Sequence, residues 1–133
     1  MRVVIDCNVW ISFLLGFQKE LIQNMLTNEH VEIFVCPQLT LEIKEVSMRP
    51  KIQTRIAEDD VEKLFRIIKA YCKTTKITNH AESSIRDNKD LYLLSLAESI
   101  HADYIISGDK DLRDLGKHKE TTILSPAEFK QIL

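Results

Sequence analysis

The chain has 133 residues, of which 44% are hydrophobic and 29% are charged, as in an ordinary globular protein. This length is typical of one domain with its own core, so we expect a single domain over residues 1–133. The formal net charge of -2 excludes a strong overall attraction to nucleic acid, which would need a local basic patch or a bound metal instead.

The first half of the chain predicts strands that each lead into a helix. Short β-branched or alternating runs indicate the strands, and apolar residues three and four positions apart indicate the helices. Asp6 stands where the first strand gives way to a helix, and Pro37 ends the second strand. The predicted elements are a strand over 2–5, helices over 9–14 and 20–26, a strand over 31–36 and a helix over 38–46.

The second half repeats this alternation. Acidic residues stand at the start of two of its predicted helices, a position that the helix dipole favours. Ser125 and Glu128 form a capping-box pattern, with proline at the first helical position between them. The predicted elements are helices over 61–72 and 90–100, strands over 104–107 and 121–124, and a last helix from 126.

Strands that alternate with helices imply right-handed crossovers and a mainly parallel sheet covered by helices on both faces. The sequence therefore predicts an α/β/α sandwich. In such sheets, ligands bind at the carboxyl ends of the strands. Asp6 and Asp109 each follow a predicted strand and are expected at that edge.

Four acidic residues are the candidate site: Asp6, Glu42, Asp90 and Asp109. Each alone is explained as a helix cap, an exposed helix residue or a turn former. Together they are expected to converge on one edge of the sheet, where their mutual repulsion favours a bound divalent cation. Carboxylate oxygens suit Mg²⁺ or Mn²⁺ better than zinc. The chemistry that this arrangement suggests is phosphodiester hydrolysis.

Successive motifs carry a resemblance to a known family. They are DCNVW at residues 6–10, LxxEI at 39–43, RDNKD at 86–90 and ADYIISGDKDL at 102–112. In this order they resemble the signatures of the PIN-domain family, over nearly the whole chain. The closing ILSPAEF at 123–129 resembles the tail of a subgroup of toxins from toxin-antitoxin pairs, relatives of the VapC toxins.

The resemblance implies a Rossmann-like α/β/α sandwich and an endoribonuclease that depends on Mg²⁺ or Mn²⁺. It also implies a cognate antitoxin as partner and a homodimer. The family's four acidic positions fall on the four candidate residues.

Other positions near the motifs also match the family. Asn8 matches a residue that orients the first aspartate, and Ser107 matches a hydroxyl near the fourth acid. Asp87 and Asp111 are additional acids, expected to be structural or to support the metal ligands. Cys7 stands where many relatives carry Thr or Ser, which puts one hydrogen bond near the site in doubt.

Several further side chains are candidate ligand contacts. The four histidines are dispersed and are expected to be solvated, and Trp10 is expected in the core. Two basic groups are explained equally well as solvated surface or as an RNA-binding patch. They are Arg66, Lys69 and Lys73 on one helix face, and Arg49, Lys51 and Arg55 before it.

Competing functions remain open at this point. A haloacid dehalogenase phosphatase requires a second aspartate where this chain has Asn8, and a receiver domain requires a lysine at a late strand end where Ser107 or Ser125 stands. A catalytically silent PIN-like module that binds RNA or protein is the main alternative to a nuclease.

The sequence also indicates a compartment. Cys7, Cys36 and Cys72 are an odd, scattered set without a CxxC pair, which favours a reducing environment. No stretch approaches the roughly 20 apolar residues of a membrane span. The opening segment carries Asp6 and no cleavage-site pattern, so we expect a cytoplasmic protein.

Overall fold

The computed structural model describes residues 1–82 and 90–133. A six-stranded sheet with the order β3-β2-β1-β4-β6-β5 forms the centre of the fold. Neighbouring strands are parallel except for β5 and β6, which are antiparallel. The strands are β1 (Arg2–Ile5), β2 (Glu32–Val35), β3 (Lys73–Thr74), β4 (Tyr104–Ile106), β5 (Lys117–His118) and β6 (Thr121–Leu124).

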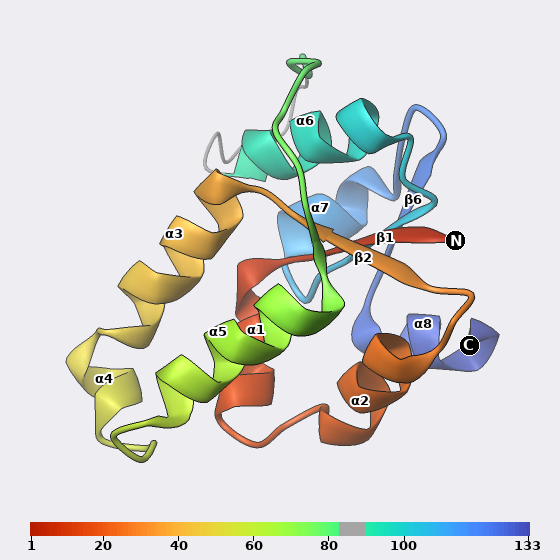
Figure 1. Ribbon diagram of the computed structural model, residues 1–133. Helices are drawn as coiled ribbons and strands as arrows, with labels where there is room; N and C mark the ends of the chain where they lie inside the picture. The colour runs from red at the N-terminus through yellow and green to blue at the C-terminus, as the bar shows by residue number, and fades with distance from the viewer. Residues whose placement is uncertain (83–89) are drawn as a thin grey trace.

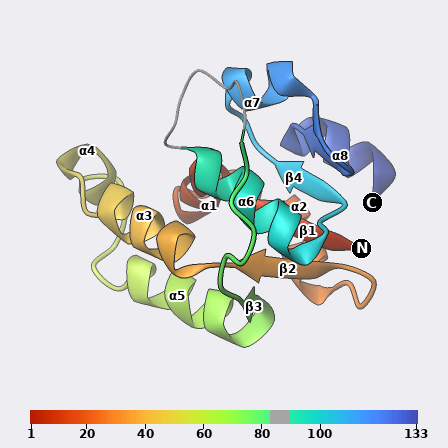
Figure 2. The ribbon, with the colours of Figure 1, turned by 90° about the horizontal axis from the view of Figure 1, so that it is seen from above.

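Helices cover both faces of this sheet. Helix α6 lies across one face, and α1, α2 and α5 lie against the other (Figures 1 and 2). The expected α/β/α sandwich with a mainly parallel sheet is confirmed. In the part of the chain that the structure describes, no helix is long and apolar enough to cross a membrane. The helices are α1 (Cys7–Leu14), α2 (Lys19–Thr27), α3 (Pro37–Ser47), α4 (Pro50–Gln53), α5 (Asp60–Tyr71), α6 (Leu91–Ile100), α7 (Lys110–Leu115) and α8 (Pro126–Ile132).

The central strands are buried along their apolar runs because both faces of a parallel sheet are covered. Val3, Val4 and Ile5 of β1 have no exposed surface, and the same is true of Ile105 and Ile106 of β4. The indole of Trp10 is also fully buried, as the sequence predicts. The carboxyl ends of β1 and β4, where Asp6 and Ser107 stand, therefore adjoin fully buried strand residues.

Four short elements were not predicted: α4, β3, α7 and β5. They span two to six residues, too few to show a period of apolar residues. Both residues of β3 are exposed, and its two residues pair only with Phe34 and Val35 of β2. These elements become regular because the neighbouring strand or helix positions them, which the local sequence does not record.

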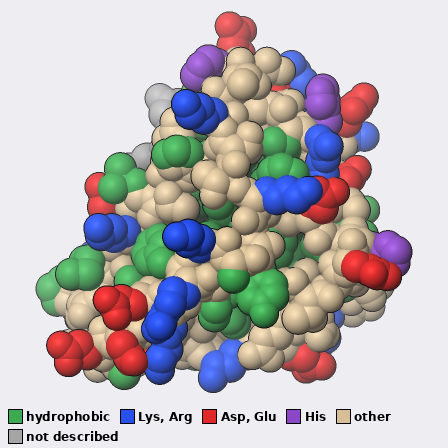
Figure 3. Space-filling model, in the orientation of Figure 1, with side chains coloured by type: hydrophobic (Ala, Val, Ile, Leu, Met, Phe, Trp, Pro, Cys, Tyr) green, Lys and Arg blue, Asp and Glu red, His purple; other side chains and the backbone are tan. Residues whose placement is uncertain are grey.

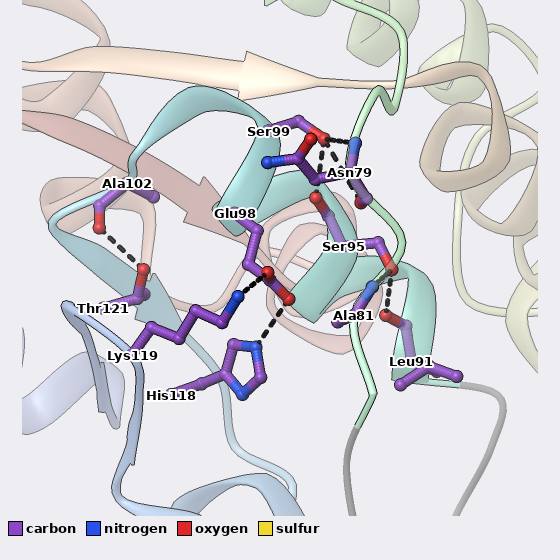
Figure 4. Close-up of polar contacts among 10 residues, drawn as sticks. All are labelled: Asn79, Ala81, Leu91, Ser95, Glu98, Ser99, Ala102, His118, Lys119 and Thr121. Carbon is purple, nitrogen blue, oxygen red and sulfur yellow. Dashed lines mark hydrogen bonds and ion pairs between the residues drawn. The ribbon is translucent and has the colours of Figure 1, made fainter.

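Helix α6 is tied to its surroundings by polar contacts on its carboxyl half (Figure 4). The hydroxyl of Ser99 accepts backbone N–H groups from Thr78 and Asn79, each at 2.9 Å. On another side, a Glu98 carboxylate oxygen lies 2.9 Å from Nε2 of His118, and the other oxygen accepts from Lys119. The expectation that all histidines are solvated is wrong for His118, which is 9% exposed. The position of α6 is thus fixed from two directions.

Candidate active site

Asp6 stands at the junction of β1 and α1, where its side chain is only 2% exposed. Its backbone N–H donates to the carbonyl of Ile106 at 2.9 Å, which continues the pairing of β1 with β4. Although Asp6 occupies the N-cap position of α1, its side chain makes no capping hydrogen bond. Its Oδ2 instead accepts from the hydroxyl of Ser107 at 2.7 Å. The carboxylate therefore points towards the carboxyl edge of the sheet and does not serve as a helix cap.

Ser107 links the first candidate acid to the fourth. Its Oγ donates to Asp6 and accepts the backbone N–H of Asp109 at 3.0 Å. Oδ1 of Asp109 then accepts the backbone N–H of Asp111 at 2.9 Å, which caps α7. Asp111 thus contributes its backbone to the turn that holds Asp109. Asp109 therefore has the turn-forming role that the sequence suggested. This turn also places its carboxylate beside β1.

Glu42 reaches the same edge from α3. Its Oε1 accepts a hydrogen bond of 2.6 Å from the hydroxyl of Tyr92, the second residue of α6. The thiol of Cys7 lies close enough that the Glu42 charge raises its pKa, after the larger effect of burial. Burial and then Glu42 also raise the pKa of Tyr92, so its hydroxyl stays protonated and donates. Glu42 therefore lies on the same side of the sheet as Asp6.

The pKa of Asp6 reflects its burial and the charges of two other acidic residues. Burial raises the pKa of Asp6 from 3.8 to about 6, and the hydrogen bond from Ser107 offsets part of this effect. The negative charges of Glu42 and Asp109 raise the pKa further. The site therefore concentrates negative charge in a water-poor position.

Asp90 precedes α6 directly and is 8% exposed. Its position two residues before Tyr92 places it near the site. The charges of Glu42 and Asp109 both act on Asp6. Asp87 lies outside the described residues. The side chain of Asn8 is exposed. The group that the structure places on the Asp6 carboxylate is Ser107.

The donor set suits a hard divalent cation. The buried Asp6 carboxylate faces two other negative groups, a cost that a cation would remove. Within residues 1–82 and 90–133, however, no group of three or more His, Cys, Asp or Glu side chains is arranged closely enough to hold a metal ion. The side chains thus fit in chemical type, and the described residues do not form a closed set of metal ligands.

The basic residues divide into two groups by location. The positive charge of Arg49 lowers the pKa of Cys7, against the larger effect of burial, so this guanidinium lies near the site. Lys44, Arg66 and Lys69 border a hollow of about 710 Å³ between α3 and α5. Figure 3 shows Lys and Arg side chains over α5, with Asp and Glu side chains beside them. The charge of Lys73 is instead paired with Glu32 at 2.5 Å.

Tyr92 is the site residue that sequence reasoning missed. It lies within an apolar helical pattern, and its partner Glu42 is 50 residues away in the chain. A signal was present nonetheless, because a tyrosine two residues after a candidate acid at a helix start lies on the first turn. Its hydroxyl needs a partner when the ring is buried.

Comparisons with known proteins agree with this geometry. A PIN domain family model matches residues 2–111. Among curated protein sequences, none matches the chain. The fold is similar to that in a crystal structure of VapBC2 from Rickettsia felis bound to a DNA fragment from its promoter, with a TM-score of 0.60 and 12% identity over 92% of this chain and 97% of that one. It is also similar to the PIN domain of human SMG5, with a TM-score of 0.58 and 12% identity over 100% of both chains.

Proposed function

Because the chain belongs to the PIN domain family, we propose that it is a metal-dependent endoribonuclease and the toxin of a toxin-antitoxin pair. The observation that carries the proposal is the buried carboxylate of Asp6, whose pKa is raised by burial and by Glu42 and Asp109. Buried groups with strongly shifted pKa values at the carboxyl edge of a parallel sheet are typical of functional sites. A protein gains no stability from such a cluster, so a function is the better explanation.

Asp6, Glu42, Asp90 and Asp109 would hold Mg²⁺ or Mn²⁺. When bound, the cation supplies Lewis-acid activation of a water and neutralises charge on the phosphodiester. Ser107 fixes the orientation of Asp6 through its hydroxyl, and it also holds the turn at Asp109. Burial of Asp6 keeps bulk water from screening its charge, which strengthens its attraction for a cation.

The basic residues support a polyanionic substrate. Arg49 near Cys7, together with Lys44, Arg66 and Lys69 beside the hollow between α3 and α5, provides positive charge around an acidic site. Such charge is required because the protein as a whole is weakly acidic. We propose that RNA contacts this face while its scissile phosphate lies at the acidic edge.

We also propose an antitoxin partner and a homodimer. The support is the likeness to the VapBC2 structure, in which that toxin-antitoxin pair is bound to promoter DNA. Purification together with the product of a neighbouring gene, and the mass of the purified protein in solution, test these two points.

A catalytically silent binding module is the competing function. It is favoured by one observation, that the described residues include no closed set of three metal-binding side chains. The two functions differ in the fate of RNA, since a binding module retains RNA without producing new ends.

The deciding experiment is cleavage of a labelled RNA at increasing Mg²⁺ or Mn²⁺, with EDTA and Asp6→Asn as controls. We expect new RNA ends with the wild type and a metal, and none with EDTA or with the variant. Induced expression in bacteria tests the toxin role, since the wild type should arrest growth and Asp6→Asn should not. RNA binding without new ends at any metal concentration contradicts the nuclease proposal and supports the binding module.

A further inference from the structure

The hydrogen bond between Tyr92 and Glu42 joins two helices at the candidate site. The phenolic hydroxyl lies 2.6 Å from Oε1 of Glu42, a length typical of a strong bond to an ionised carboxylate. Tyr92 is in the first turn of α6 and Glu42 is in the middle of α3. These helices come from segments on either side of β3, so no local feature of the chain brings the two groups together.

We propose that Tyr92 is a positioning residue, whose hydroxyl holds the Glu42 carboxylate facing Asp6 in readiness for a divalent cation. This inference rests on the proposed function. It adds to that function a residue outside the four acids, with a defined partner atom and a defined role.

Glu42 needs such a partner for two reasons. A glutamate side chain has several freely rotating bonds, and fixing them costs free energy unless a contact compensates. Asp6 is also an acidic residue of the same site, and like charges repel each other. Without a hydrogen-bond donor, the Glu42 carboxylate would be free to move away from Asp6. The Tyr92 hydroxyl supplies a directional attraction that opposes this movement.

Tyr92 is suited to the role because its helix is fixed. Helix α6 packs on β1 and is tied through Ser99 to Thr78 and Asn79. A hydroxyl on this helix is therefore a fixed reference point for a more flexible side chain. Groups that orient metal ligands in this way typically change metal affinity by about 10-fold to 100-fold when they are removed.

The bond could instead serve only to join α3 to α6. The two roles separate in Tyr92→Phe, which keeps the ring and removes the hydroxyl. Tyr104→Phe is the matched control, since Tyr104 is also half-buried but begins β4 at the opposite end of that strand from Ser107. Its ring packs edge-on against Phe129, with centroids 5.6 Å apart, and this contact survives the change.

The test uses two measurements: Mn²⁺ binding by calorimetry without RNA, and thermal unfolding in EDTA. They are made on the wild type, both phenylalanine variants, Glu42→Gln, and the double variant Glu42→Gln with Tyr92→Phe. We expect Tyr92→Phe to weaken Mn²⁺ binding by about 10-fold or more while Tyr104→Phe leaves it unchanged. In the Glu42→Gln background, Tyr92→Phe should have no further effect on Mn²⁺ affinity, because the hydroxyl acts through that carboxylate.

Two results overturn the inference in distinguishable ways. If Tyr92→Phe binds Mn²⁺ as tightly as the wild type, with or without a lower melting temperature in EDTA, the bond is structural only and the proposed function stands. If the wild type itself fails to bind Mn²⁺ at millimolar concentrations, the proposed metal-dependent function fails and this inference fails with it.

Discussion

The substitution Asp6→Asn should stabilise the metal-free protein at neutral pH. The amide has nearly the same shape as the carboxylate but no charge to bury. The pKa of Asp6 rises from 3.8 in an unfolded chain to about 6 in the folded protein. Since a tenfold change in proton affinity corresponds to about 1.4 kcal/mol, the ionised form destabilises the fold by about 3 kcal/mol.

The sign of this effect gives it a characteristic pH dependence. Below pH 3.8 Asp6 is protonated in both states, so the wild type and Asp6→Asn should be equally stable. As the pH rises through about 6, the wild type loses stability and the variant does not. The difference should therefore open above pH 4 and level off near pH 7, at about 3 kcal/mol.

Urea unfolding in EDTA, followed by the fluorescence of Trp10, measures the difference. This residue is the single tryptophan and is fully buried. At an m-value of about 2 kcal/mol/M, the midpoint of Asp6→Asn should lie about 1.5 M higher at pH 8. Asp114→Asn, which removes an exposed carboxylate, controls for the change in net charge. A difference that is the same at pH 4 and pH 8, or a less stable variant at pH 8, refutes the reasoning. Added Mg²⁺ should stabilise the wild type more than the variant.

Two further substitutions probe the supports of the site. Ser107→Ala removes the hydrogen bond to Asp6 and should lower the unfolding free energy at pH 7 by about 1.5–3 kcal/mol, measured by urea titration. It should also slow RNA cleavage, measured in the cleavage assay. Glu98→Gln removes the charge facing His118 and Lys119, which hold the pKa of Glu98 below its ordinary 4.5. A lowered pKa stabilises the fold above pH 4.5, so the variant should be less stable by about 1–3 kcal/mol at pH 7. Urea titrations should show this gap closing as the pH falls below 4.5.

The strands that could be predicted are those whose burial leaves a pattern of apolar residues in the sequence. Strands β1, β2 and β4 contain buried apolar runs because both faces of the sheet are covered, whereas β6 alternates between buried and half-buried residues. Turn signals or helical patterns bound each of the four strands. Strands β3 and β5 have two residues each and carry no such signal. They form because β2 and β6 offer unpaired backbone groups, a property of the assembled sheet and not of the residues that add to it.

The proximity of the candidate site residues could be predicted, but their hydrogen-bond partners could not. Asp6 and Asp109 each follow a strand, and parallel strands bring their carboxyl ends to one edge, so their proximity follows from the fold. The sequence does not give the partners of each carboxylate, because hydrogen-bond pairing depends on side-chain direction across distant helices. Tyr92 and His118 illustrate this limit, since each has a carboxylate partner that no local pattern indicates.

The anchoring of α6 has a consequence for how distant changes reach the site. A helix is stiff along its axis, and Glu98 lies about 9 Å along it from Tyr92 at 1.5 Å per residue. Weakening the contact of Glu98 with His118 would let the carboxyl end of α6 move. The opposite end of α6 carries Tyr92, and Asp90 directly precedes it. Substitutions in the β5–β6 hairpin that weaken its contact with Glu98 should then change how Asp90 and Tyr92 are placed at the site.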